Sequence, residues 1–335
     1  MGRISTRVLK RSGLEVTTIG LGSAAIGGLF SEVSECAALE MLDAAYNHGV
    51  RFFDTAPFYG HGLAEQRVGQ ALVGRPRDEF VLSTKVGRLL RVGAPPDLSV
   101  TPNNEPFFPG APADVNPVFD FSADGVRRSF EESLERLGID RVDLLLIHDP
   151  DDYGDQVLEE ALPALLELRD AGTIRAVGVG MNQSEMLARF AHQGDFDCFL
   201  LAGRYTLLDQ TALDELLPLC VERDIAVIIG GVFNSGVLAN PTPASRFDYL
   251  RVEPDVLARA RRLEAVCELH GVPLRAAAIQ FPLAHPAVVS VLCGARSRNE
   301  FVDFLAMANM KIPGDLWTDL RDRGLLTNQA PVAMD

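Results

Sequence analysis

Short apolar runs alternate with longer amphipathic segments along the whole chain. In the segment 122–138, apolar residues recur at helical spacing between a serine suited to begin a helix and a glycine suited to end it. The short runs, such as 142–147 and 225–229, are apolar throughout, which is typical of parallel strands that helices cover. The pattern predicts strands at 17–22, 50–54, 80–84, 142–147, 174–179, 196–201, 225–229 and 288–292.

Helices are expected between these strands. The intervening segments predict them at 35–47, 64–73 and 122–138, up to 169, at 185–191, up to 222, at 254–271 and from 299 onward. Eight strand–helix units in a chain of 335 residues favour one (β/α)₈ TIM barrel, a single domain over residues 1–335. A doubly wound sheet with a second domain is the alternative. No linker-like change of composition divides the chain, and this favours the barrel.

Three segments fall outside the repeat. The segment 7–16, with a Ser-Gly pair at its centre, predicts an N-terminal β-hairpin before the first barrel strand. The segment 86–120 follows the third strand as a long loop with seven prolines, and 234–251 is a shorter insertion after the seventh strand. Both insertions are expected at the C-terminal rim of the barrel, where active sites of such folds are built.

Composition narrows the classes of function. Hydrophobic residues make up 47% and charged residues 23% of the chain, which is typical of a soluble globular protein. Its apolar runs are too short to span a bilayer, and residues 1–7 lack the apolar core of a signal peptide, so we expect a cytoplasmic protein. With 31 Lys and Arg against 46 Asp and Glu, the net charge is −15, which disfavours nucleic acids and anionic membranes as partners.

Neither the cysteines nor the acidic residues form a metal-binding pattern. The five cysteines contain no Cys-x-x-Cys pair, so we expect reduced thiols rather than a disulfide framework or a zinc site. Asp149, Asp151, Asp152 and Asp155 lack the order and the closing Glu of a calcium loop. We therefore expect no metal, and a solvated loop at 149–155.

Candidate chemistry appears where polar residues end three consecutive predicted strands. Asp54 ends the second strand, Lys85 the third and His148 the fourth, and Tyr59 follows shortly after Asp54. Neighbouring strands lie about 5 Å apart, so these side chains can converge at one rim of a barrel. A Lys ammonium beside a phenol favours the phenolate and is expected to lower the pKa of Tyr59. Such a phenol can exchange a proton with an alcohol or carbonyl oxygen, which suits hydride transfer with a bound cofactor.

These positions resemble the aldo-keto reductase superfamily. The resemblance rests on the stretch 54–60, which reads Asp-Thr-Ala-Pro-Phe-Tyr-Gly, on the residues 60–65 that follow, and on the order of Lys85 and His148. It implies the barrel and a nicotinamide cofactor at its C-terminal rim. By resemblance, Tyr59 is the proton donor or acceptor, Lys85 tunes it, Asp54 supports Lys85, and His148 orients the substrate oxygen. We call these four residues the tetrad.

The same resemblance implies a cofactor site. Residues 291–298 resemble the loop that binds the adenosine phosphate, where Arg296 or Arg298 could hold a 2′-phosphate, and Asn182 occupies the carboxamide-binding position. Met181, Ala202 and the pair Gly230–Gly231 depart from the residues usual in the family, which puts NADP preference in doubt and slightly favours NAD. The implied cofactor-binding residues are Gly22, Asn182, Gly231, Phe233, Ser235, Gly236, Gly294, Arg296 and Arg298.

The segments 147–152, 201–208 and 230–238 resemble one subgroup of the family. That subgroup contains sugar 1-dehydrogenases, of the L-fucose, D-threo-aldose and galactose types, and pyridoxal 4-dehydrogenase. The implied reaction is oxidation of a cyclic hemiacetal to a lactone, with Tyr59 as the base and a small molecule as the substrate. Phe58, His61, Phe107 and Phe108 are the expected substrate residues. A general NADPH-dependent aldehyde or ketone reductase and a redox-sensing cofactor-binding subunit are the alternatives.

Overall fold

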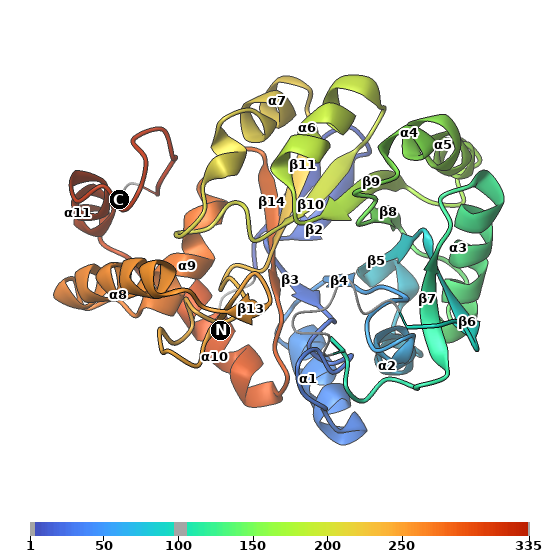
Figure 1. Cartoon of the computed structure of the whole chain (residues 1–335), viewed down its shortest axis with the longest axis horizontal. Helices are drawn as coiled ribbons and strands as arrows, with labels where there is room; N and C mark the ends of the chain where they lie inside the picture. Colours follow the sequence, from blue (N-terminus) through green and yellow to red (C-terminus); the bar gives the residue numbers. More distant parts are fainter. Residues whose placement is uncertain (1–3, 97–105, 334–335) are drawn as a thin grey trace.

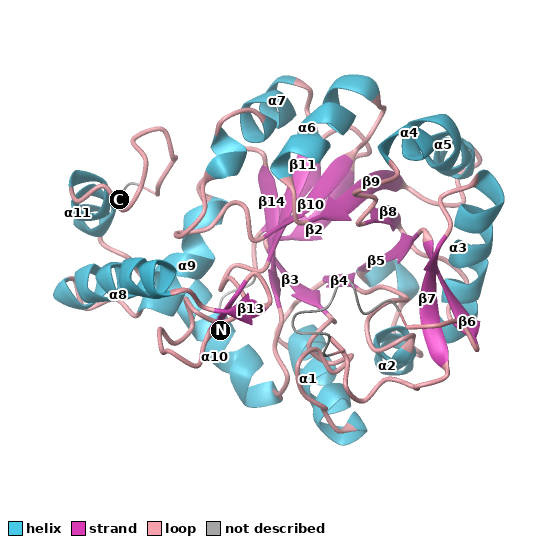
Figure 2. Cartoon of the chain, in the orientation of Figure 1, coloured by secondary structure: helices cyan, strands magenta, loops and turns pink. Residues whose placement is uncertain are grey.

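Eight parallel strands close into a barrel in the computed structural model, which describes residues 4–96 and 106–333. Around the barrel the order is β10-β11-β14-β3-β4-β5-β8-β9. Figure 2 shows this ring of strands with helices around it. The predicted TIM barrel is therefore correct. Its strands are β3 (Ile19–Gly22), β4 (Phe52–Asp54), β5 (Val81–Val86), β8 (Leu144–His148), β9 (Ala176–Met181), β10 (Cys198–Ala202), β11 (Ala226–Gly230) and β14 (Val288–Cys293).

Amphipathic helices connect the strands and bury one face against the barrel. In α3 (Ala123–Leu137), the Ser122 side chain accepts a hydrogen bond from the Gly125 amide, and Gly138 ends the helix in the left-handed conformation. The other helices between barrel strands are α1 (Glu35–Asn47), α2 (Leu63–Leu72), α4 (Gly154–Gln156), α5 (Leu162–Asp170), α6 (Ser184–Gln193) and α7 (Leu216–Glu222). A π-helical segment, Val157–Ala161, joins α4 to α5. The chain closes with α10 (Arg298–Ala308) and α11 (Gly314–Asp322).

Two helices, not the single expected one, lie between β11 and β14. The expected helix at 254–271 is α8 (Pro254–Leu269), but it packs on α9 (Leu274–Leu283) and α11 rather than on the barrel. The helix that packs on β14 is α9, which the sequence pattern missed. Seven of its ten residues are buried, and Pro282 lies inside it, so it has no polar face to mark a helical period.

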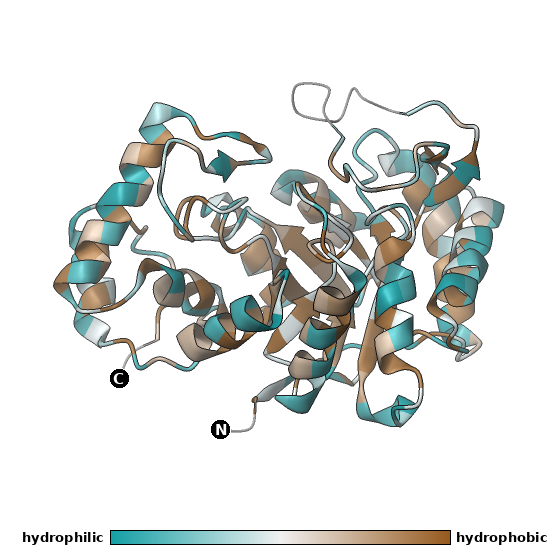
Figure 3. Cartoon of the chain, turned by 90° about the horizontal axis from the view of Figure 1, so that it is seen from below, coloured by the Kyte–Doolittle hydropathy of each residue, from teal (hydrophilic) through white to brown (hydrophobic). Residues whose placement is uncertain are grey.

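The predicted hairpin at 7–16 is present and closes the N-terminal end of the barrel. Its strands are β1 (Thr6–Leu9) and β2 (Leu14–Thr17), paired antiparallel. Leu9, Leu14 and Val16 join one buried cluster with the inward side chains of the barrel strands. A larger cluster lies between barrel and helices, and Figure 3 shows apolar strands surrounded by helices of mixed hydropathy.

The two rim insertions also contain hairpins, which the sequence did not predict. In 86–120, β6 (Arg88–Val92) pairs with β7 (Val115–Phe119), while Pro102 and the rest of 97–105 lie outside the described residues. Pro117 is tolerated within β7 because this two-stranded ribbon leaves one side of each strand unpaired. In 234–251, β12 (Arg246–Phe247) pairs with β13 (Leu250–Arg251).

Candidate active site

The alternation of side chains along the barrel strands brings three residues of the tetrad together. Phe52, Val81 and Leu146 point into the barrel, and residues two or four positions further along the same strands share that face. Asp54, Lys85 and His148 are therefore the inward residues at the carboxyl ends of β4, β5 and β8. All three are at most 4% exposed.

Lys85 and Asp54 form a buried ion pair. Lys85 Nζ lies 2.7 Å from Asp54 Oδ2 and donates a second hydrogen bond to the Thr55 carbonyl at 2.9 Å, while Ser83 Oγ donates to Asp54 Oδ1 at 2.6 Å. Burial alone would lower the pKa of Lys85, but Asp54 and Tyr59 outweigh it and raise the pKa above its usual value. Lys85 therefore stays protonated despite its burial.

Tyr59 lies against this pair, on the loop between β4 and α2. Its ring centroid is 4.7 Å from Lys85 Nζ and 5.6 Å from the His148 ring. Contrary to the expectation of a lowered value, burial raises the pKa of Tyr59, and the Lys85 charge only opposes this rise. The phenol is therefore the dominant form near neutral pH, ready to donate a proton.

His148 is held as a neutral imidazole. Burial lowers its pKa well below the usual range, and the positive charges of Arg88 and Lys85 lower it further. Its Nδ1 atom is buried and has no hydrogen-bond partner among the described residues. A neutral ring protonated on Nε2 can still donate one hydrogen bond to a substrate oxygen.

Two charged residues that the sequence reasoning did not place in the site lie beside His148. Asp149 Oδ2 is 3.5 Å from His148 Nε2, and the Arg88 guanidinium binds the same oxygen at 2.6 Å. Asp149 therefore lies in a paired, partly buried position, not in the solvated loop that we expected. The sequence offered one hint of Asp149, because this residue directly follows His148. No motif in the sequence pointed to Arg88.

A cavity of about 530 Å³ leads away from the tetrad. Asp54 and Tyr59 line one part of it, and Arg275, Asp303 and Met307 are among its other lining residues. Seven of the expected cofactor residues line the cavity: Gly22, Gly231, Phe233, Ser235, Gly236, Gly294 and Arg296. The described residues that line the cavity do not include Asn182, Arg298 or the four expected substrate residues. Asn182 instead lies 3.4 Å from the Tyr249 hydroxyl, and Arg298 is exposed.

The Arg296 part of the cavity is suited to an anion. Ser297 caps α10, so the positive end of this helix lies next to Gly294 and Arg296 on the cavity wall. No atom lies within 4 Å of the Cβ that a side chain at Gly294 would add, so the wall there is open. A cavity lined by Tyr59 at one part and by the start of α10 at another fits a nicotinamide dinucleotide.

Aromatic rings from three segments form a wall beside the tetrad. Phe58 meets Phe108 edge to face at 5.2 Å, and Phe107 meets Tyr249 at 5.2 Å. His61 stacks on Phe58, and its Nδ1 lies 2.6 Å from the Val115 carbonyl of β7. The wall thus joins the loop after β4 to both rim insertions. Tyr249, in the turn of the β12–β13 hairpin, was not expected from the sequence.

Comparisons with known proteins identify the family. The model of the aldo/keto reductase family matches residues 18–322. The chain belongs to the aldo-keto reductase family. It is 42% identical to pyridoxal 4-dehydrogenase of Microbacterium luteolum, over 96% of this chain and 98% of that protein. It is 41% identical to D-threo-aldose 1-dehydrogenase of a Pseudomonas species, over 94% of this chain and 96% of that protein.

A solved structure supports the fold. The glycerol dehydrogenase of Gluconobacter oxydans has a TM-score of 0.76 at 23% identity, and the match covers 100% of this chain and 98% of that one. Membership of the aldo-keto reductases makes this chain an NAD(P)-dependent oxidoreductase. In the described part of this aldo-keto reductase, no helix is long and apolar enough to cross a membrane, and no His, Cys, Asp and Glu side chains group as a metal site.

Proposed function

We propose that this enzyme oxidises the cyclic hemiacetal of an aldose, or of pyridoxal, to the corresponding lactone with NAD⁺. The observation that carries the proposal is the buried Asp54–Lys85 pair against the Tyr59 ring, which supports a proton-transfer role for this phenol beside the cavity. The two relatives above 40% identity support the substrate class, because their names state pyridoxal and an aldose.

The tetrad has a separate task for each member. In oxidation, the Tyr59 oxygen accepts the proton of the hemiacetal hydroxyl as its C–O bond becomes the lactone carbonyl. Lys85 stabilises the phenolate form of Tyr59, and Asp54 keeps Lys85 charged and in place. Neutral His148 donates a hydrogen bond from Nε2 to the reacting oxygen and so orients it.

The cavity residues would hold the cofactor. They are Gly22, Gly231, Phe233, Ser235, Gly236 and Gly294, all of which line the cavity. When bound, the oxidised nicotinamide supplies the acceptor for the hydride that leaves the hemiacetal carbon. We also assign Asn182 to the carboxamide and Arg298 to the outer edge of the phosphate site, as the family resemblance implies.

NAD is the favoured cofactor because the cationic part of the cavity is already paired. Arg296 donates from Nη2 to Glu300 Oε1 at 2.8 Å and from Nε to Oε2 at 3.3 Å. Arg275 forms an ion pair with Asp303. Carboxylates beside the cavity repel a 2′-phosphate, whereas a carboxylate can accept a hydrogen bond from a ribose hydroxyl.

The test is a substrate panel with purified enzyme. L-Fucose, D-arabinose, L-galactose and pyridoxal are each mixed with NAD⁺ or NADP⁺, and absorbance at 340 nm is followed. We expect a rise with at least one substrate, and a faster rise with NAD⁺. Faster reduction of nitrobenzaldehyde with NADPH than any of these oxidations would indicate a general aldehyde reductase. Cofactor binding without turnover, together with a stable protein partner, would indicate a sensor.

A further inference from the structure

A carboxylate that the tetrad does not use lies beside His148. Asp149 follows β8, and its amide donates to the Gly180 carbonyl at 2.9 Å. Its φ of +43° is a conformation that costs energy for a residue other than glycine, and such strain is concentrated at functional sites. The Asp149 side chain keeps about a quarter of its surface exposed, at 23%.

The first insertion supplies the residue that holds Asp149 in place. Arg88 begins β6, is 7% exposed, and binds Asp149 Oδ2 through Nη2 at 2.6 Å. Its guanidinium carbon lies 4.4 Å from the centroid of Phe58 and 4.8 Å from that of Phe119, which fixes the group from two sides. Its Nε atom is buried and unpartnered within the described chain. Arg88 is therefore restrained, with one buried donor left unused.

Asp149 and His148 lie side by side, so they can bind two neighbouring oxygens of one substrate. Their Oδ2 and Nε2 atoms lie 3.5 Å apart, and no hydrogen bond joins them. His148 Nε2 donates its one hydrogen bond to the reacting oxygen, so the Asp149 carboxylate can accept from a hydroxyl on the neighbouring carbon, whereas a substrate without that hydroxyl has nothing to donate. An analogue that lacks the hydroxyl covers the partly exposed carboxylate without giving it a hydrogen bond, so a site of this kind disfavours such analogues.

We propose that Asp149, positioned by Arg88, binds a second hydroxyl of the substrate, on the carbon next to the reacting one. The ligand class is 2-hydroxyaldehydes and their cyclic hemiacetals. The inference rests on the proposed function for the reacting oxygen, and it adds a selectivity that the tetrad does not provide. It also gives the 86–120 insertion a task, since that insertion carries Arg88.

Substrate pairs that differ only in the 2-hydroxyl test the proposal. Lactaldehyde and propanal are compared in reduction with NADH, and D-arabinose and 2-deoxy-D-ribose in oxidation with NAD⁺. For the native enzyme, we expect kcat/KM to be at least tenfold higher for the hydroxylated member of each pair. A ratio below threefold in both pairs overturns the proposal. If only the oxidation pair fails to turn over, the lactone-forming function fails, while the reduction pair still reports on Asp149.

Substitution of the carboxylate gives the second test. Asp149→Asn removes the charge and suits the positive φ, and we expect it to lower the lactaldehyde-to-propanal ratio of kcat/KM at least tenfold. If the substitution only disturbs the tetrad, kcat/KM falls equally for lactaldehyde and propanal, and their ratio stays unchanged. That result would refute the role of Asp149. Asp151→Asn makes the same change at an exposed position two residues away and should keep the native ratio.

The positioning role of Arg88 has its own readout. Arg88→Met retains an apolar stem between the two rings but removes the charge, so we expect KM for lactaldehyde to rise at least fivefold with a smaller change in kcat. Arg88→Lys should restore part of the loss. Equal loss in kcat for lactaldehyde and propanal would show that Arg88 only supports the fold. This variant also tests the proposal if Asp149→Asn does not fold.

Discussion

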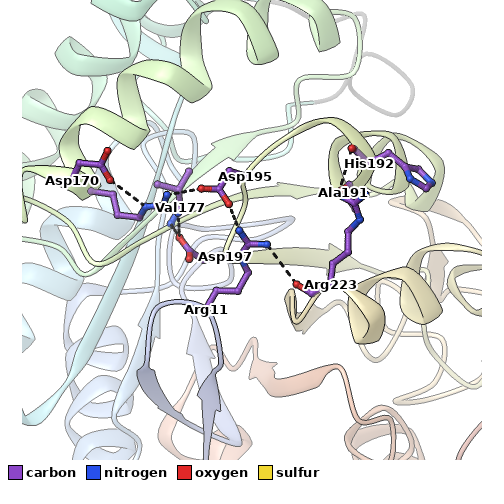
Figure 4. A network of polar contacts seen from close by, with 9 residues as sticks. Arg11, Asp170, Val177, Ala191, His192, Asp195, Asp197 and Arg223 are labelled. Carbon is purple, nitrogen blue, oxygen red and sulfur yellow. Dashed lines mark hydrogen bonds and ion pairs between the residues drawn. The ribbon is translucent and has the colours of Figure 1, made fainter.

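The N-terminal end of the barrel and its C-terminal rim both bury carboxylates, but they use them differently. At the N-terminal end, Asp197 Oδ2 accepts from the Val177 amide at 2.8 Å and from Arg169 at 3.0 Å. The Asp197 amide in turn donates to the Val177 carbonyl at 2.8 Å. Asp143 repeats this arrangement with Leu82, at 2.9 Å and 2.8 Å. Figure 4 shows the network around Asp197, which Asp195 extends to Arg11 of the N-terminal hairpin.

At the rim, polar groups are held in place but keep bonding capacity. Asp54 is fully engaged with Lys85 and Ser83, but His148 Nδ1 and Arg88 Nε have no partner among the described residues. Asp149 and Tyr249 have positive φ angles of 43° and 66°. Paired carboxylates at the N-terminal end stabilise the closed barrel, whereas the rim holds residues in strained conformations and buried polar atoms without partners among the described residues.

The largest effect is expected at the rim, from Tyr59→Phe. The variant lacks the proton-transfer oxygen, so turnover should fall roughly 10²–10⁴-fold. Because the ring remains, cofactor affinity in a fluorescence titration and the melting temperature should stay near the native values. Native turnover by the variant would contradict the role of Tyr59.

At the N-terminal end, Asp197→Ala should reduce stability without changing chemistry. It leaves the buried Val177 amide unpaired and removes one partner of Arg169, so the free energy of unfolding should fall by about 2–4 kcal/mol. Urea denaturation measures this loss, and kcat of the folded variant should stay within twofold. Asp170→Ala is the matched control, because the Asp170 side chain is 79% exposed and 4.0 Å from Arg169. Equal losses from both variants would contradict the capping role of Asp197.

The raised pKa of Tyr59 predicts different pH responses of the two reaction directions. Oxidation needs the phenolate, which becomes more populated as pH rises toward the pKa, so kcat/KM for oxidation should increase up to about tenfold per pH unit above pH 7. Reduction uses the phenol and should stay level over the same range. Initial rates in both directions from pH 6 to 9 provide the measurement. An oxidation rate that falls with pH would show that another group limits the reaction.

The smallest effect is expected for an exposed pair near the N-terminal end. Lys10 and Asp224 form an ion pair with side chains that are 71% and 53% exposed. Because water screens such pairs, Lys10→Met should change the free energy of unfolding by less than about 0.5 kcal/mol. A larger change in the free energy of unfolding, measured by urea denaturation, would show that burial does not decide which carboxylates stabilise the protein.

Much of the fold could be predicted from the sequence because local patterns repeat. The eight strands, the hairpin at 7–16 and the cap of α3 each depend on residues that are near one another in the chain. The elements that the sequence did not predict lack such a local pattern. The helix α9 is buried almost all round and lacks a polar face, and β6 and β7 pair across an insertion rich in proline. Such elements form through distant contacts.

The order of residues along the chain was enough to identify those that could carry the chemistry. Asp54, Lys85 and His148 end apolar strands, and the fixed alternation of a strand points such residues to one face. The environment of these residues depends on the folded barrel. Closure of the barrel partly buries Tyr59 so that its pKa rises rather than falls, and it brings Arg88 from an insertion against Asp149. Burial and the approach of distant charges depend on the whole fold, because desolvation and Coulomb energies act through space rather than along the chain.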